Sequence, residues 1–82
     1  MSKFVVWAYA EANASREREP WLEDIRELET DSVEVEADSI EEMKKLAWEL
    51  LEDETYAAED AFREEHGVAT YGYDWELWWE EA

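Results

Sequence analysis

The sequence contains no cysteine, one proline, two glycines and only seven Lys or Arg among its 82 residues. Without cysteine, the chain can form neither a disulfide nor a thiolate metal site. Two glycines, at positions 67 and 72, do not make a phosphate-binding loop. No apolar run approaches the about 18 residues of a membrane span, and no basic region followed by an apolar core marks a secretory signal. We therefore expect a cytoplasmic protein.

Negative charge is what the sequence has in excess. Asp and Glu number 25, and the formal net charge is −18. Such a chain repels phosphate, which excludes nucleic acid and anionic membranes as direct partners. The hydrophobic fraction of 46% and the aromatic fraction of 15% are too high for a disordered acidic tail. The length then allows one folded acidic domain over residues 1–82.

Strand-forming segments lie near both ends of the sequence. Residues 3–10 are β-branched and aromatic, which predicts a buried strand, and the polar segment 11–19 predicts a loop. Residues 68–73 and 75–79 also have strand character. Gly72 is expected to mark a bulge or a turn between these two strands.

Two further segments lie between these ends. Residues 32–37 alternate apolar and acidic side chains, which predicts a half-buried strand with Glu34 and Glu36 on its outer face. Residues 20–29 begin with proline, which fits the first turn of a helix. A short helix is predicted because apolar residues follow at helical spacing, namely Trp21, Leu22, Ile25 and Leu28.

The segment 40–66 carries the strongest helical pattern of the chain. Ser39 is a good N-cap, Glu42 completes a capping box, and Gly67 is a natural stop. One apolar face runs through the segment and contains Ile40, Met43, Ala47, Leu50, Leu51, Ala58, Ala61 and Phe62. A single long helix fits this pattern, and a break at 52–55, with Thr55 capping a second helix, is the alternative.

The order of these elements predicts an α+β fold, with a small antiparallel sheet packed on the long, possibly broken helix. Most of the six Trp are expected in the core, because large aromatics help a small domain to bury enough surface. Trp48 falls off the apolar helix face and Trp78 breaks the strand alternation. Both are therefore expected to be exposed and available to a partner.

The sequence offers no catalytic or metal-binding constellation. The single histidine, His66, comes just before Gly67, where a cation interacts with the last helix carbonyls and the helix dipole. No EF-hand pattern occurs, so only weak association of Ca²⁺ or Mg²⁺ with the acidic surface is expected. We expect a protein that is not an enzyme and has no metal site and no cofactor.

The candidate functional residues are the acidic side chains of the predicted solvent faces, together with one tryptophan. Alternate residues of a strand lie about 6.6 Å apart, and alternate phosphates of one DNA strand advance about 6.8 Å. A rigid acidic face can therefore resemble a phosphate track. The candidates are Glu34, Glu36, Glu41, Glu42, Glu49, Glu52, Asp53, Glu59, Asp60, Glu64, Asp74, Glu76, Trp78, Glu80 and Glu81.

In size, charge and α+β character, the whole chain resembles the small, acidic, phage-encoded inhibitors that mimic DNA, of the anti-CRISPR and antirestriction type. The resemblance implies a non-enzymatic inhibitor, acting as a monomer or weak dimer in the host cell cytoplasm. It also implies a partner that is a cationic nucleic-acid-binding protein, such as a CRISPR effector complex or a restriction or repair enzyme. Carboxylates would there pair with the Arg and Lys that normally hold phosphates.

Two other interpretations of the acidity remain open. Proteins that work in molar salt carry excess acid and few Lys, and this chain has Lys only at positions 3, 44 and 45. The acidity would then serve solvation and would have no specific partner. Alternatively, the chain is a binding module for a basic protein, with its contact centred on Trp75, Trp78 and Trp79.

Overall fold

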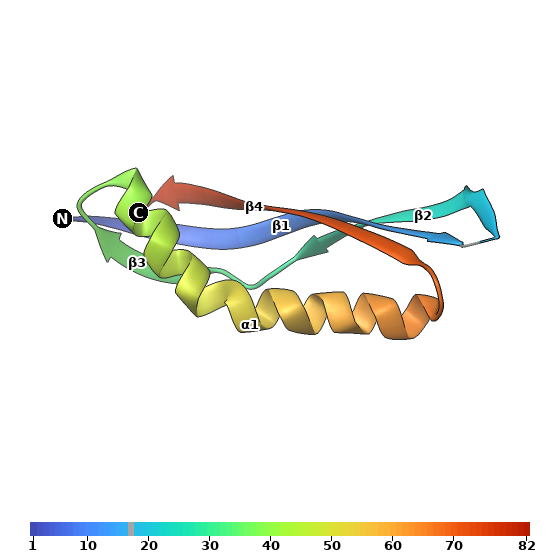
Figure 1. The fold of residues 1–82 in the computed structure, drawn as a ribbon. Coiled ribbons are helices and arrows are strands. Elements are labelled where there is room, and N and C mark those ends of the chain that lie inside the picture. Colours follow the sequence, from blue (N-terminus) through green and yellow to red (C-terminus); the bar gives the residue numbers. More distant parts are fainter. Residues whose placement is uncertain (17) are drawn as a thin grey trace.

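The computed structural model describes residues 1–16 and 18–82, without the side chains of Pro20 and Leu22. In this part of the chain, four strands and one helix follow one another as β1 (Ser2–Arg16), β2 (Glu19–Glu29), β3 (Val33–Ala37), α1 (Ile40–His66) and β4 (Thr70–Glu81). All strand pairs are antiparallel, and α1 lies along one face of the sheet (Figure 1). The predicted α+β class and the predicted helix–sheet packing are confirmed.

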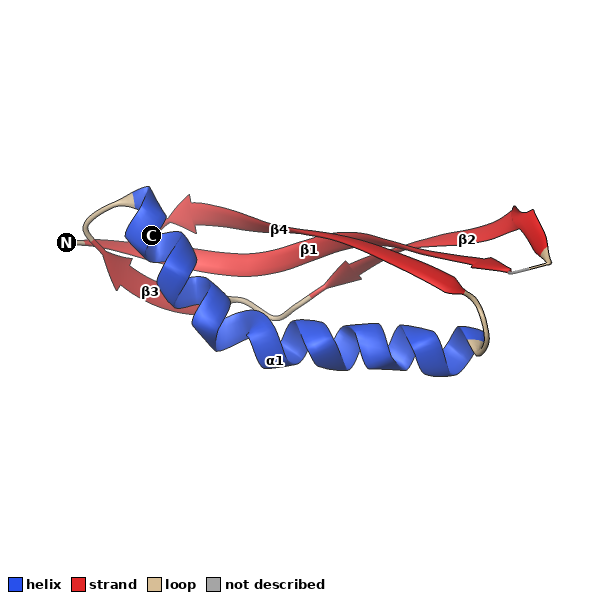
Figure 2. Cartoon of the chain, viewed as in Figure 1, coloured by secondary structure: helices blue, strands red, loops and turns tan. Residues whose placement is uncertain are grey.

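Strand β1 is the centre of the sheet and pairs along both of its edges. One edge pairs with β4 over nearly the whole length of β1. The other edge pairs with β2 near the hairpin end and with β3 near the N-terminus. Strands β2 and β3 therefore lie end to end, and the sheet is long but only three strands wide (Figure 2).

Thr30 carries the hydrogen-bond ladder across the gap between β2 and β3. Its N–H donates to Ala8 O at 2.9 Å, and its Oγ1 accepts from Ala8 N–H at 2.9 Å. The hydroxyl thus takes the place of a backbone carbonyl, and Thr30 is buried. Both backbone groups of Ala8 on this edge therefore have partners, and the two separate strands continue along one edge of β1.

From Phe4 to Ala14, strand β1 alternates between a buried face and a partly exposed face. Its buried face begins with Phe4 and Val6 and continues with four alanines, at positions 8, 10, 12 and 14. These small side chains let α1 approach the sheet closely. Met43, Ala47 and Leu51 of α1 pack on the N-terminal half of this face, and Phe62 packs on the C-terminal half.

Helix α1 has the bounds that the sequence predicts. Ser39 Oγ accepts from Glu42 N–H at 3.1 Å, and Gly67, with φ 66°, donates its N–H to Arg63 O at 2.8 Å. The alternative of a break at 52–55 is wrong, because the helix is continuous. It does change direction part-way along (Figure 1). Thr55, buried inside it, donates its hydroxyl to Glu52 O at 2.7 Å, a kind of contact that often bends helices.

Three predictions of secondary structure are wrong. The segment 20–29 is strand rather than helix, and most of 11–19 continues β1 instead of forming a loop. The two C-terminal segments form the single strand β4, with neither bulge nor turn at Gly72. Gly72 lies directly opposite Asn13, and a Cβ at this position would come within 3.0 Å of the Asn13 side chain. Gly72 thus leaves room for the side-chain amide of Asn13 on the neighbouring strand.

The molecule is a rod. Its principal extents are 52 × 19 × 16 Å, and its radius of gyration is 15.2 Å. A compact domain of this length would have a radius of gyration of about 12 Å. The molecule is elongated because the long hairpin of β1 and β2 and the single long helix lie side by side (Figure 1).

Candidate functional site

The exposed carboxylates of the rod gather on two opposite sides. One side is the outer surface of α1, and the other is the face of the sheet that α1 does not cover, which we call the open face. The open face carries every second residue of each strand. Its carboxylates are all exposed, and they are Glu11, Glu23, Glu27, Glu29, Glu34, Glu36, Asp74, Glu76 and Glu80.

The strand register places these carboxylates in rows on both sides of β1. One row follows β3 and β2, and the other follows β4. Between them, β1 carries Glu11 directly opposite both Glu27 and Asp74. Like charges directly opposite one another destabilise a sheet. The fold therefore retains a local electrostatic penalty at this rung.

The open-face carboxylates have few partners inside the protein. Within residues 1–16 and 18–82, none of them makes an ion pair, and Lys3 is the only cation on this face of the paired strands. Glu76 accepts a hydrogen bond from the indole N–H of Trp78 at 2.7 Å. Hydrogen bonding to Glu27 raises the pKa of the Tyr9 hydroxyl, and burial and the charges of Glu27, Glu11 and Glu76 raise it further.

Helix α1 carries eight of the carboxylates predicted from the sequence, most of them on its outer surface. They are Glu41, Glu42, Glu49, Glu52, Asp53, Glu59, Asp60 and Glu64. This side also carries its own cations, namely Lys44, Lys45 and Arg63.

Several of these helix carboxylates are engaged within the protein. Asp60 lies 3.5 Å from an Arg63 nitrogen. Glu59 is half-buried and accepts from Trp75 Nε1 at 2.7 Å, so it faces β4 rather than solvent. The outer surface of α1 is therefore less continuously acidic than the open face.

The structure thus divides the predicted site residues between the two sides. Glu34, Glu36, Asp74, Glu76, Trp78 and Glu80 come together on the open face. Glu81 pairs opposite Phe4, a register position of the helix-facing side, and belongs to neither group. The prediction missed the open-face carboxylates Glu11, Glu23, Glu27 and Glu29. The alternation of alanine with larger or polar residues at positions 8–15 could have placed Glu11 on a strand face, whereas the positions of Glu23, Glu27 and Glu29 depend on the pairing of β2 with β1.

An aromatic cluster lies in the middle of the open face. Trp78 stacks on Tyr9, with ring centroids 4.9 Å apart, and meets Trp7 edge-on at 6.4 Å. Trp78 is 46% exposed, which confirms that it is available at the surface. Trp48, on α1, is 36% exposed and is likewise at the surface. Trp75 is half-buried and packs against the core. Trp21 and Trp79 are exposed as well, so the prediction that most of the six Trp lie in the core is wrong.

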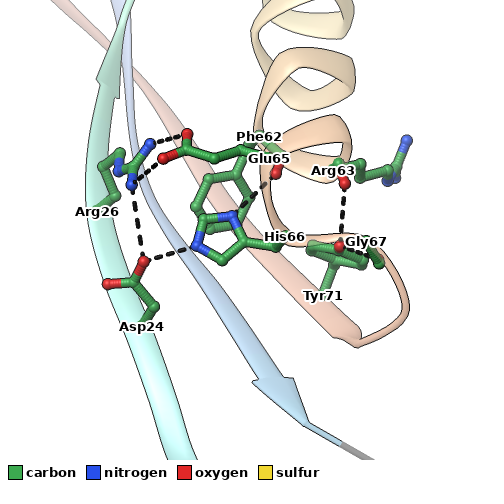
Figure 3. A network of polar contacts seen from close by, with 8 residues as sticks. All are labelled: Asp24, Arg26, Phe62, Arg63, Glu65, His66, Gly67 and Tyr71. Carbon is green, nitrogen blue, oxygen red and sulfur yellow. Dashed lines mark hydrogen bonds and ion pairs between the residues drawn. The ribbon is translucent and has the colours of Figure 1, made fainter.

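His66 belongs to a polar network that fastens the end of α1 to β2 (Figure 3). Its Nδ1 lies 2.9 Å from Phe62 O, and its Nε2 lies 2.6 Å from Asp24 Oδ2. The neighbouring Arg26 holds Glu65 through both guanidinium nitrogens. The predicted contact of His66 with a last-turn carbonyl is confirmed, and Asp24 is a second partner that sequence reasoning did not find.

Both oxygens around His66 are acceptors, so both ring nitrogens can donate only when the ring is protonated. The hydrogen bond to Asp24 accordingly raises the pKa of His66, and the Phe62 carbonyl raises it further. The same contact lowers the pKa of Asp24, and hydrogen bonding to Arg26 lowers that of Glu65. When His66 is protonated, the network consists of ion pairs that link the end of α1 to β2.

The surface beside this network is hollowed by a pocket of about 380 Å³. The described residues that line this pocket are Ala14, Arg16, Glu23, Asp24, Glu65, His66 and Ala69. They include no Ser, Thr, Cys or Lys that could act as a nucleophile. Across residues 1–16 and 18–82, no group of three or more His, Asp or Glu side chains could hold a metal ion. No helix in that same part of the chain is long and apolar enough to cross a membrane.

The chain matches no family model, and it shows no significant similarity to curated proteins or to solved structures. The geometry and charge of its two acidic sides are therefore the basis for any functional inference.

Proposed function

We propose that this protein is a non-enzymatic inhibitor that mimics DNA and occupies the nucleic-acid-binding site of a cationic protein. The partner class would be a CRISPR effector complex or a restriction or repair enzyme. Such an inhibitor would act in the cytoplasm of the host cell, as a monomer or weak dimer. The observation that carries the proposal is a rod with unpaired carboxylates in rows along its length.

The linear charge density of the rod supports this proposal. Eighteen net negative charges lie over a length of 52 Å, which is one charge per 2.9 Å. Duplex DNA carries about one charge per 1.7 Å of its axis, and each of its strands about one per 3.4 Å. The rod as a whole therefore carries nearly the same charge per unit length as a single DNA strand.

The spacing of the open-face rows is a second support. Alternate residues of one strand lie about 6.6–6.8 Å apart, close to the advance of alternate phosphates. The two rows stand two strand spacings apart, about 9.5 Å, with β1 between them. Because the sheet fixes the backbone of these residues, only side-chain freedom is lost when they pair with a partner's Arg and Lys.

Competition with DNA tests the proposal. The chain, immobilised through its C-terminus, is exposed to host-cell extract at low salt, and the column is then washed with duplex DNA. A parallel wash contains no DNA and is brought to the same ionic strength with NaCl. We expect the retained proteins to bind nucleic acid and to elute with duplex at a salt concentration that does not elute them by itself.

The opposite result is a partner that stays on the column under saturating duplex. Such a partner would bind this chain and DNA at separate sites. That outcome would favour the binding module for a basic protein over the DNA mimic.

A further inference from the structure

The aromatic cluster of Trp7, Tyr9 and Trp78 is surrounded by carboxylates. On β1, Tyr9 lies between Glu29 of β2 and Glu76 of β4. The rungs on either side of the cluster are acidic as well. They place Glu34 and Glu80 beside Val5, and Glu27 and Asp74 beside Glu11.

Packing of the core does not account for this cluster, because its rings lie on the face opposite α1. The buried residues of β1 all have the other parity. Trp78 leaves nearly half of its surface in water, and a hydrogen bond to Glu76 holds its indole in place. An exposed aromatic cluster held in one orientation is typical of the centre of a binding surface.

Arginine is the side chain that suits this combination of groups. Its planar guanidinium stacks on aromatic rings and, at the same time, pairs with a carboxylate through two parallel hydrogen bonds. Lysine is a point charge and cannot make the planar contact. The open face offers stacked rings and unpaired carboxylates within two rungs of one another.

The outer surface of α1 suits such a partner less well. Its cations Lys44, Lys45 and Arg63 would repel an arginine-lined surface. An aromatic ring near that side, Trp79, already has the Lys44 Nζ 4.8 Å from its centroid. Charge complementarity therefore favours the open face.

We propose that the open face is the docking surface, and that it receives an arginine-lined groove of the partner with one guanidinium stacked on Trp78. This inference rests on the proposed function, because it takes that groove to be one that normally holds nucleic acid. Beyond the proposed function, this inference specifies which side of the rod docks, which ring anchors the contact and which basic side chain of the partner is preferred.

Peptide binding tests the anchor without any nucleic acid. Octa-arginine and octa-lysine, which carry equal charge, are titrated into the chain at low salt and followed by calorimetry. We expect octa-arginine to bind about two- to five-fold more tightly. Trp78→Leu should abolish this preference, and Trp48→Leu, the matched change at an exposed tryptophan of α1, should leave it intact. Circular dichroism confirms that each variant is folded.

Paired charge variants test which side docks. Glu29→Gln with Glu76→Gln removes two charges beside the cluster, and Glu49→Gln with Asp53→Asn removes two from α1. The open-face pair should weaken octa-arginine binding several-fold more than the helix pair. Equal loss in both pairs, or a preference for arginine that survives Trp78→Leu, would overturn the proposal. A change in the sedimentation of the free chain with Trp78→Leu would mean that a second copy covers this face, which also contradicts it.

These outcomes are independent of the DNA competition experiment. If the captured partner resists elution by duplex while the peptide preference depends on Trp78, the DNA-mimic proposal fails and the docking face stands. If duplex elutes the partner but changes at Trp78 and its neighbouring carboxylates have no effect on peptide binding, the docking-face proposal fails and the DNA-mimic proposal stands.

Discussion

Replacing Glu11 by Gln should stabilise the protein. Glu11 faces Glu27 on one neighbouring strand and Asp74 on the other, with Cβ atoms about 4.5–5.5 Å apart in such pairs. Each cross-strand pair is worth about 0.2–1 kcal/mol, so relieving two repulsions should add about 0.4–2 kcal/mol. For a domain of this size, each kcal/mol raises the melting temperature by about 4–8 °C.

Glu36→Gln is the matched control, because it makes the same change of charge on the same face. Glu36 lies opposite Lys3, so its neutralisation removes an attraction and should not stabilise the fold. Urea unfolding at about 0.05 M and 1 M NaCl measures both variants. The gain from Glu11→Gln should shrink at 1 M, where the screening length falls to about 3 Å. If the two variants behave alike, or if the Glu11→Gln gain does not depend on salt, the reasoning is refuted.

Three further predictions concern the whole fold. Thermal melts should show cooperative folding already at tens of millimolar NaCl, with the melting temperature rising as salt screens self-repulsion; a chain that folds only near molar salt would instead be salt-adapted. An NMR titration should place the pKa of His66 above 6.5, and Asp24→Asn should lower this pKa. The stability that His66 contributes should then be complete below pH 6.5 and be lost as the pH rises through the raised pKa. Thr30→Val should cost about 1–3 kcal/mol by leaving the Ala8 N–H without a partner, whereas Thr30→Ser should cost less in urea unfolding.

The sequence predicts the elements whose signals are local. Ser39 and Gly67 cap α1, and the alternating residues of β3 have a buried and an exposed face within five positions. The fold class followed from these elements, because a long amphipathic helix and half-buried strands need each other to cover their apolar faces.

Strand β2 was not predictable in the same way. Trp21, Ile25 and Leu28 have helical spacing, yet in the strand Ile25 lies on the open face and Leu28 faces the helix side. Strand β2 is an edge strand with few contacts to α1, so its sequence lacks the alternation of apolar and polar residues that marks a half-buried strand. Its conformation depends on pairing with β1, which is a long-range interaction and overrides local propensity.

The candidate site was incomplete for the same reason. With β2 taken as a helix and residues 11–19 as a loop, Glu11, Glu27 and Glu29 had no common face. The cluster of Tyr9 and Trp78 also needs the register of β1 against β4, which joins residues nearly 70 positions apart. The proposed kind of partner rests on charge and composition, whereas the sheet register decides which side of the rod presents the unpaired carboxylates.

Displacement of DNA from a purified partner is the decisive test of DNA mimicry. A labelled duplex is bound to the partner recovered from the DNA-elution experiment, this chain is added, and fluorescence anisotropy follows the release of the label. We expect complete release, and the variant with Glu29→Gln and Glu76→Gln should require more protein than the helix pair to reach the same release. A ternary complex that retains the duplex at saturating concentrations of this chain would contradict it.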